Sequence, residues 1–102
     1  MILYVSGPMT GIPDFNRPAF MGAAAVLRAR GHKVLNPAEN PEPACRSWLG
    51  YMRLAIKQLA EADVVVLIDG WSESRGARVE FNIASGLGLP VFHFNDMERI
   101  PA

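Results

Sequence analysis

The sequence predicts an α/β domain of three layers, in which a mostly parallel sheet is flanked by helices. Short apolar runs alternate with longer amphipathic stretches, and the links between them are short, which is the pattern of doubly wound sheets. The run at 64–68, Val-Val-Val-Leu-Ile, is apolar throughout, as expected for a strand that is buried on both faces. At 102 residues the chain has the size of a single domain, covering 1–102.

Apolar periodicity and turn residues define the expected elements. Asn16 is the expected N-cap of the first helix, and Gly31 is its expected C-terminal stop. Residues 37–47 contain three prolines and should form a surface loop, and the residues after 94 should form a tail. The expected strands are 2–6, 32–36, 64–68 and 90–94, and the expected helices run from Pro18 to about 30, from about Arg46 to Ala60, and from Arg75 to Gly86 or Gly88.

Composition limits the classes of function. Lys+Arg and Asp+Glu number ten each, so the net charge gives no reason to expect nucleic acid or an anionic membrane as a partner. No apolar run approaches the roughly 18 residues of a membrane span, and residues 1–5 resemble a strand rather than a signal peptide. The single Cys45 has no internal disulfide partner, and no Cys/His spacing indicates zinc. We therefore expect a cytoplasmic protein without a metal site.

Two loops are expected to meet at one edge of the sheet, because the carboxyl ends of parallel strands lie together. The loop 6–14 is rich in glycine and proline, and the loop 69–75 leads into a helix whose first N–H groups can bind an anion. In the alternative interpretation these glycines and prolines only turn the chain, since the spacing matches neither a Walker loop nor Gly-x-Gly-x-x-Gly. The residues that would hold a phosphate at this edge are Ser6, Gly7, Thr10, Gly11, Arg17 and Ser74.

Glu80 is the carboxylate closest to this edge on the third helix, about one turn after its start. Its neighbours Val79, Phe81 and Ile83 are apolar, which is unusual for a solvent-facing glutamate. A glutamate in a helix more often faces solvent or pairs with arginine. Position alone therefore leaves both a catalytic and an ordinary structural role open.

The other conspicuous side chains are assigned structural roles. Trp71 is interpreted as a packing lid, and Trp48 and Tyr51 as core or subunit contacts. His93 lies at a strand end without a visible partner in the sequence, and Cys45 lies on a polar loop without a neighbouring base.

Three segments together resemble the nucleoside 2-deoxyribosyltransferase superfamily: residues 4–11 (Tyr-Val-Ser-Gly-Pro-Met-Thr-Gly), residues 62–66 (Ala-Asp-Val-Val-Val), and Ser74-x-Gly76-x-x-x-Glu80. The likeness covers roughly residues 2–94, and the details at 69–71 and 74–77 are most similar to an uncharacterised bacterial and phage branch. The resemblance implies a Rossmann-like (flavodoxin-like) fold with four to five strands. It also implies a homodimer or homotetramer that cleaves N-glycosidic bonds without a metal or another cofactor.

The resemblance assigns roles to individual residues. Glu80 would attack the anomeric carbon, and Tyr4 would orient its carboxylate. Ser74 stands where the transferases have an aspartate for the sugar 5′-hydroxyl, and where the nucleoside 5′-monophosphate hydrolases of the superfamily have a serine. An aspartate would repel a phosphate, whereas a serine donates a hydrogen bond to it. Ser6 and Ser74 therefore favour a nucleotide over a free nucleoside.

One position departs from the superfamily pattern. Eight residues before Asp63, where an aspartate contacts and helps to protonate the leaving base, this chain has Ala55. Asp69, at the end of a strand, is the candidate to replace it as a catalytic acid. The superfamily also has a fifth strand that is not expected here, so a partner subunit is a candidate to complete the pocket.

The sequence thus predicts a nucleoside 5′-monophosphate N-glycosidase-like or deoxyribosyltransferase-like protein that acts on a nucleotide or nucleoside. The alternative is a nucleotide-binding module, a sensor or regulator whose catalysis is impaired by Ala55; a structural subunit of a larger assembly is a third possibility. The predicted catalytic residues are Glu80, Tyr4 and Asp69, and the predicted phosphate- and sugar-binding residues are Ser6, Gly7, Pro8, Met9, Thr10, Gly11, Arg17, Ser74 and Gly76.

Overall fold

The computed structural model of the protein describes residues 1–42 and 47–101. Within these residues it contains one four-stranded parallel sheet in the order β2-β1-β3-β4, so the predicted α/β fold class is confirmed. The strands are β1 (Ile2–Ser6), β2 (Lys33–Leu35), β3 (Val64–Leu67) and β4 (Val91–His93), and the α-helices are α1 (Arg17–Ala29), α2 (Trp48–Glu61) and α3 (Arg75–Leu87). Short 3₁₀ segments are η1 (Pro13–Asn16), η2 (Pro37–Glu39), η3 (Trp71–Glu73) and η4 (Phe94–Arg99).

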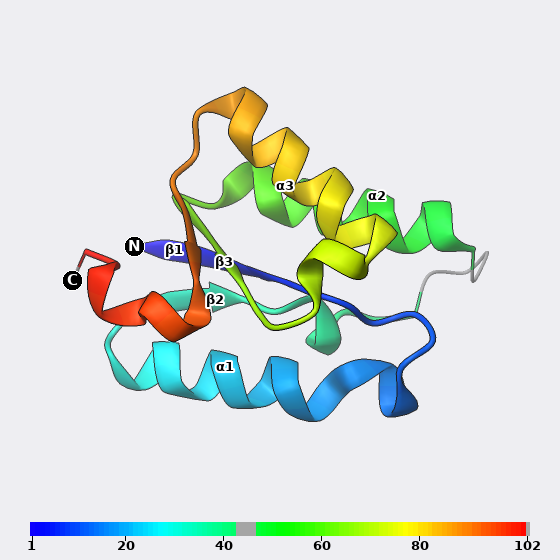
Figure 1. Cartoon of the computed structure of the whole chain (residues 1–102), viewed down its shortest axis with the longest axis horizontal. Coiled ribbons are helices and arrows are strands. Elements are labelled where there is room, and N and C mark those ends of the chain that lie inside the picture. Colours follow the sequence, from blue (N-terminus) through cyan, green and yellow to red (C-terminus); the bar gives the residue numbers. More distant parts are fainter. Residues whose placement is uncertain (43–46, 102) are drawn as a thin grey trace.

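The helices divide between the two faces of the sheet. Helix α1 covers one face, and α2 and α3 lie together on the other (Figure 1). Strand β1 lies between β2 and β3, with Leu3 opposite Val34 on one side and Val64 on the other. All four residues of β3 are buried, as their unbroken apolar character requires for a strand with covered faces.

The alternation of side chains along β1 builds two separate cores. Leu3 and Val5 point toward α1 and join a cluster that includes Phe20 and Leu27. Tyr4 points the other way and joins a cluster on the side of α2 and α3, with residues Ala55, Leu59, Val65, Leu67 and Ala84 among its buried members. Because side chains two residues apart share a face, Ser6 lies on the same face as Tyr4.

The predicted C-terminal tail is wrong in one respect. Residues 94–99 form η4, and Ile100, which follows it, is only 5% exposed and packs into the core cluster on the α1 side. Phe94 and Met97 pack against the same cluster. These three apolar residues recur every third position, which matches the period of a 3₁₀ turn and places them on one side of it.

One helix start differs from expectation. Asn16 does precede α1, but it adopts a left-handed conformation and its side chain makes no capping bond. Its Nδ2 instead donates to the Pro8 carbonyl at 2.9 Å. Helix α2 begins at Trp48, where Ser47 Oγ accepts a hydrogen bond from the Gly50 N–H. The predicted start at Arg46 and the prediction for Cys45 lie outside the described residues.

Across the described chain, no helix is long and apolar enough to cross a membrane.

Candidate active site

A cavity of about 950 Å³ opens at the carboxyl edge of the sheet. Its walls come from the loop after β1, from the segment around η2, from the first turns of α2 and from the start of α3. This is the edge at which open α/β sheets bind ligands. Glu80 lines the cavity from α3, and Tyr4 lines it from β1.

Glu80 is held by two hydroxyl groups from β1. Helix α3 turns Ala77, Glu80 and Ala84 toward the sheet, since residues three and four apart share a helix face. Tyr4 Oη donates to Glu80 Oε2 at 2.6 Å, and Ser6 Oγ donates to Oε1 at 2.7 Å. Both carboxylate oxygens are therefore fixed in place, and the alternation of β1 is the reason that both donors reach the same side chain.

The surroundings of Glu80 act on its charge in opposite directions. Burial raises its pKa, because a carboxylate loses hydration, while the hydrogen bonds from Tyr4 and Ser6 lower it. Burial, followed by the nearby Glu80 charge and the hydrogen bond to it, raises the pKa of Tyr4 well above its usual value. Tyr4 therefore remains a protonated donor, and the two hydroxyls favour an ionised Glu80 in an apolar setting.

The loop after β1 passes very close to the end of β3. A side chain added at Gly7 would clash with Ile68 Cγ1 and would place its Cβ 2.8 Å from Ile68 Cδ1. Glycine is therefore required for close packing at this point, and Gly7, Pro8, Met9 and Thr10 follow along the cavity wall.

Replacing Gly7 by alanine is expected to destabilise the fold by about 1–3 kcal/mol, the usual cost of overpacking a core. Urea unfolding followed by circular dichroism measures the effect. Gly22→Ala is the matched control, because an added Cβ on α1 meets nothing within 4 Å; a helical glycine replaced by alanine should gain about 0.5–1 kcal/mol. Equal effects of the two substitutions would contradict the close-packing argument.

Helix α3 presents polar groups to the cavity at its first turn. Ser74 Oγ accepts a hydrogen bond from the Ala77 N–H at 3.2 Å, so its own hydroxyl hydrogen can be donated elsewhere. The Arg78 N–H bonds to the Ser74 carbonyl, whereas the Arg75 and Gly76 N–H groups precede the first intrahelical bonds. Gly76 also lets α3 approach α2, since a Cβ there would lie 3.2 Å from Met52 Sδ.

Most of the predicted phosphate- and sugar-binding residues lie on the cavity wall, but two do not. Ser6 is fully buried beneath it and bonds to Glu80. Gly11 adopts a φ of 84° and serves the turn of the loop, as the alternative interpretation of the glycines holds. The predicted residues that line the cavity are Gly7, Pro8, Met9, Thr10, Arg17, Ser74 and Gly76.

Asp69 is not among the residues that line this cavity, so the structure gives no support to its predicted role as a replacement acid. It lies beyond β3 with its side chain 86% exposed, beside a separate groove. His93 Nε2 is 3.1 Å from Asp69 Oδ1, and the His93 Nδ1 accepts from the Asn95 N–H. Gly70, the next residue, adopts a φ of 87° and turns the chain back toward the cavity, which leaves Asp69 on the far side of the turn.

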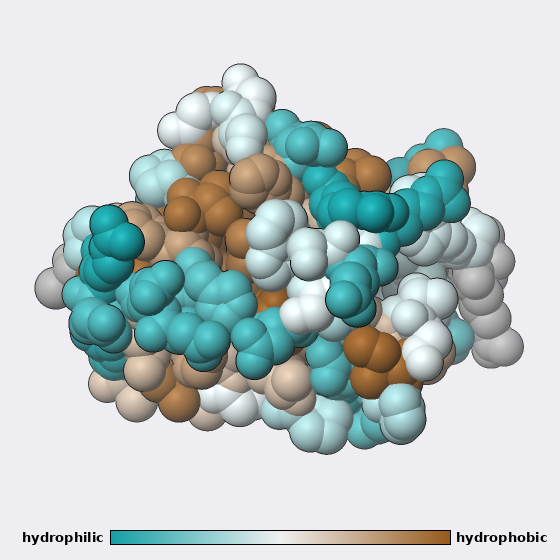
Figure 2. All heavy atoms as spheres, viewed as in Figure 1, coloured by the Kyte–Doolittle hydropathy of each residue, from teal (hydrophilic) through white to brown (hydrophobic). Residues whose placement is uncertain are grey.

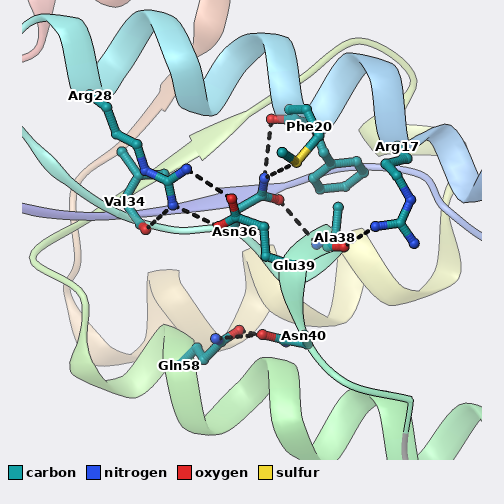
Figure 3. Close-up of polar contacts among 10 residues, drawn as sticks. Arg17, Phe20, Arg28, Val34, Asn36, Ala38, Glu39, Asn40 and Gln58 are labelled. Carbon is teal, nitrogen blue, oxygen red and sulfur yellow. Dashed lines mark hydrogen bonds and ion pairs between the residues drawn. The ribbon is translucent and has the colours of Figure 1, made fainter.

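The part of the cavity wall around η2 is fixed by side-chain amides that sequence patterns did not reveal. Asn36 Oδ1 accepts from the Ala38 N–H, and its Nδ2 contacts the Phe20 carbonyl and Met21 Sδ, which ties the start of η2 to α1 (Figure 3). Asn40 and Gln58 exchange two hydrogen bonds of 2.8 and 2.7 Å, which join this wall to α2 (Figure 3). The sequence predicted only a surface loop here, because the segment after β2 has no apolar period; in the structure it includes η2, and Ala38 is buried.

Arg17 forms part of this fixed wall. Its Nη1 donates to the Ala38 carbonyl at 2.6 Å, and its Nε lies 3.8 Å from Asp14 (Figure 3 shows the bond to Ala38). A second ion pair, between Arg28 and Glu39, holds the other end of η2; it lowers the pKa of Glu39 through the hydrogen bonds from Arg28.

Two tryptophans have different environments. Trp71 stacks on Phe81 at 4.9 Å between ring centroids, which agrees with its interpretation as a packing residue. Trp48 and Tyr51, interpreted as core or subunit contacts, line the cavity. The Arg75 guanidinium lies over the Trp48 ring, with 4.0 Å from Cζ to the ring centroid.

Ala55, at the position where the superfamily has an aspartate, also lies on the cavity wall. Ala55 is 7% exposed and lines the cavity from α2. Among the described residues that line the cavity, the carboxylates other than Glu80 are Glu42 and Glu73. In the described part of the chain, no group of three or more His, Cys, Asp or Glu side chains is placed to hold a metal ion.

The fold, with a cavity at the carboxyl edge of its parallel sheet, is similar to that of a solved 2-deoxyribosyltransferase, and this likeness identifies a member of the nucleoside 2-deoxyribosyltransferase-like superfamily. The solved 2-deoxyribosyltransferase of the psychrotolerant bacterium Bacillus psychrosaccharolyticus is 25% identical, with a TM-score of 0.72 over 91% of this chain and 71% of that one. Within this class, the chain belongs to the family described as Domain of unknown function (DUF4406), whose profile matches residues 1–93. A search of the curated proteins finds no match to this chain.

Proposed function

We propose that this protein cleaves the N-glycosidic bond of a nucleoside 5′-monophosphate or a related nucleoside, by hydrolysis or by transfer, with Glu80 as the nucleophile. The observation that carries the proposal is the buried Glu80 carboxylate at the cavity wall, with one hydroxyl donor on each oxygen. The likeness to a solved 2-deoxyribosyltransferase supports the same chemistry. A surface glutamate would have no need of two buried donors.

In the first step, a Glu80 oxygen forms a bond to the anomeric carbon while the bond from that carbon to the base nitrogen breaks. The bonding electrons leave with the base, which takes up a proton, and the sugar remains as an ester of Glu80. In the second step, water or another base attacks the same carbon, the ester bond breaks and the carboxylate is restored with loss of a proton. Tyr4 and Ser6 keep the carboxylate oriented through both steps.

The second candidate function is nucleotide binding without turnover, and Ala55 is the observation that favours it. A retaining glycosidase ordinarily uses two carboxylic groups, one to attack and one to protonate the leaving group. Ala55 has no proton to give, and general acid catalysis contributes about 10²–10⁴ in rate. A binding module would keep the cavity while its chemistry is slow.

Incubation with a panel of ribonucleoside and deoxyribonucleoside 5′-monophosphates, with and without an acceptor base, tests the proposal. Free base or an exchanged nucleoside is measured by liquid chromatography. Release or exchange that depends on protein concentration supports N-glycosidic cleavage. Binding of nucleotide without any product at high protein concentration supports the second candidate, and the absence of both binding and product overturns the two together.

Replacing Ser6 by alanine should lower activity most at acidic pH. Loss of the hydrogen bond removes one influence that lowers the pKa of Glu80, so that pKa rises and the acid limb of the pH–rate profile moves to higher pH. We expect kcat/KM at neutral pH to fall about tenfold, the equivalent of one hydrogen bond to a charged group. Ser85→Ala, on the exposed side of α3, is the control. A uniform loss at every pH would assign Ser6 a packing role instead.

We further propose that the protein assembles as a homodimer or homotetramer. Figure 2 shows an apolar area between the edge strand β4 and α3. Leu87, the last residue of α3, is 60% exposed. A strand edge beside apolar surface is a ready site for association with another chain. Light scattering across a range of protein concentrations measures the mass in solution, and a strictly monomeric mass would overturn this proposal.

A further inference from the structure

We propose that Arg75, held on the ring of Trp48, is the residue that makes the cavity prefer a phosphorylated sugar over a neutral one. The inference rests on the proposed function, because it concerns the sugar side of the same substrate. It goes further by naming a specificity-determining cation that no sequence motif indicated.

The geometry of the pair leaves the hydrogen-bonding edge of Arg75 available. Its guanidinium lies over Trp48 with 4.0 Å between Cζ and the ring centroid, and both residues line the cavity. Stacking uses the flat face of the guanidinium, whereas its N–H groups lie in the plane and point outward. Trp48 is the first residue of α2, which Ser47 caps, so the aromatic platform is fixed to a helix start. The stack therefore restrains the cation without consuming its donors.

The other arginine on the wall is committed elsewhere. Arg17 Nη1 donates a hydrogen bond to the Ala38 carbonyl at 2.6 Å, and Arg17 Nε lies 3.8 Å from Asp14 Oδ1. These contacts fix the η2 wall to α1. Two arginines are among the described residues that line the cavity, and Arg75 is the better placed of the two to pair with an anionic group of a ligand.

Carboxylates on the wall favour a cation beside an anionic ligand. Glu73 and Glu80 both line the cavity, so a phosphate bound there would be repelled by carboxylate charge. A guanidinium pairs with phosphate through two parallel N–H bonds, which offsets this repulsion. Ser74, next to Arg75 in the chain, has a hydroxyl hydrogen left to donate because its oxygen already accepts from Ala77. A phosphate with three oxygens can use both donors at once.

Titration with ribose 5-phosphate and with ribose tests the inference without knowledge of the base. The chain has two tryptophans, so the indole N–H signals in NMR spectra report on Trp48 at the cavity and on Trp71 in its stack with Phe81. Ribose 5-phosphate should shift the Trp48 signal at lower concentration than ribose does. Arg75→Met should weaken binding of ribose 5-phosphate about 10- to 100-fold, as expected for loss of a charged hydrogen-bonding partner, and should leave ribose binding within about twofold.

Matched variants separate the role of Arg75 from general charge effects. Arg78→Met removes the same charge one turn along α3, at a position that is not among the cavity-lining residues, and should leave both affinities unchanged. Glu73→Gln removes a repelling charge and should tighten binding of ribose 5-phosphate alone. Arg75→Lys keeps the charge but not the planar stack, and should recover only part of the affinity.

The outcomes distinguish this inference from the proposed function. Equal weakening of ribose and ribose 5-phosphate in Arg75→Met, or an unchanged preference between them, overturns the inference. Preference for the phosphate that depends on Arg75, in a protein that releases no base, upholds the inference while the proposed catalysis fails. Base release from free nucleosides at least as fast as from nucleotides upholds the catalysis and overturns the inference.

Discussion

Replacing Glu80 by glutamine is expected to abolish base release, with a loss of at least about 10³-fold, as is usual when a catalytic nucleophile is removed. Glutamine keeps the size of the side chain and an oxygen for one hydroxyl donor, but its amide is too weak a nucleophile to form the glycosyl ester. Affinity for nucleotide should be retained, since Ser74 and the loop after β1 remain in place. Base release and nucleotide binding, measured on the same preparation, provide the two readouts.

A stability measurement separates lost chemistry from lost folding. The pKa of Glu80 is raised in the folded state, so the folded protein holds that proton more tightly than the unfolded chain does. This contribution to stability is fully present below the unfolded pKa and is lost as the pH rises through the folded pKa. Glu80→Gln cannot lose a proton, so its stability relative to the wild-type protein should increase as the pH rises from below the unfolded pKa of the glutamate through its higher folded pKa.

Glu61→Gln, at the exposed end of α2, is the matched control for the charge change and should leave the rate unchanged. Undiminished base release by Glu80→Gln would remove Glu80 from the mechanism. Loss of activity together with loss of the folded state would show that Glu80 is needed for structure instead.

Only part of the environment of Glu80 could be predicted from the sequence. The apolar run at residues 2–6 and the helix expected from Arg75 were predicted from the sequence pattern, whereas the pairing of Tyr4 with Glu80 was implied only by the family resemblance. The period of a strand also places Ser6 on the same face as Tyr4. Its hydroxyl was nevertheless assigned to a phosphate, because sequence order does not show that α3 brings Glu80 within 2.7 Å of Ser6.

Interactions between irregular segments could not be predicted from the sequence. Arg17 and Arg75 were alike as charged residues near helix starts, yet one is fixed to a carbonyl and the other rests on an aromatic ring. The two arginines differ because η2 brings the Ala38 carbonyl to Arg17, whereas the start of α2 brings Trp48 to Arg75. Neither position could be read from a period of apolar residues. Asp69 was misplaced for a similar reason, since the turn at Gly70 decides which side of the strand end it faces.

The two candidate functions differ at one side chain, and a substitution can test that difference. Ala55 lines the cavity and is 7% exposed, so an aspartate there would have its carboxyl group at the part of the cavity wall that α2 forms. If leaving-group protonation is what the cavity lacks, Ala55→Asp should increase the rate of base release by about 10²–10⁴, the contribution of a positioned general acid. The new acid must be protonated to act, so the added activity should decline as the pH rises above its pKa.

Ala55→Asn is the matched control, because it has nearly the same shape and no acidic proton. A gain with aspartate but not with asparagine, and its loss in Ala55→Asp combined with Glu80→Gln, would establish that the cavity needs an acid and that Glu80 is its nucleophile. A fast wild-type protein that gains nothing from aspartate would show that the base is protonated by other means, with Glu42 and Glu73 as the remaining carboxylates on the described wall. A folded, nucleotide-binding Ala55→Asp protein without turnover would instead favour the binding module, since restoring the acid would then have left the site without its reaction.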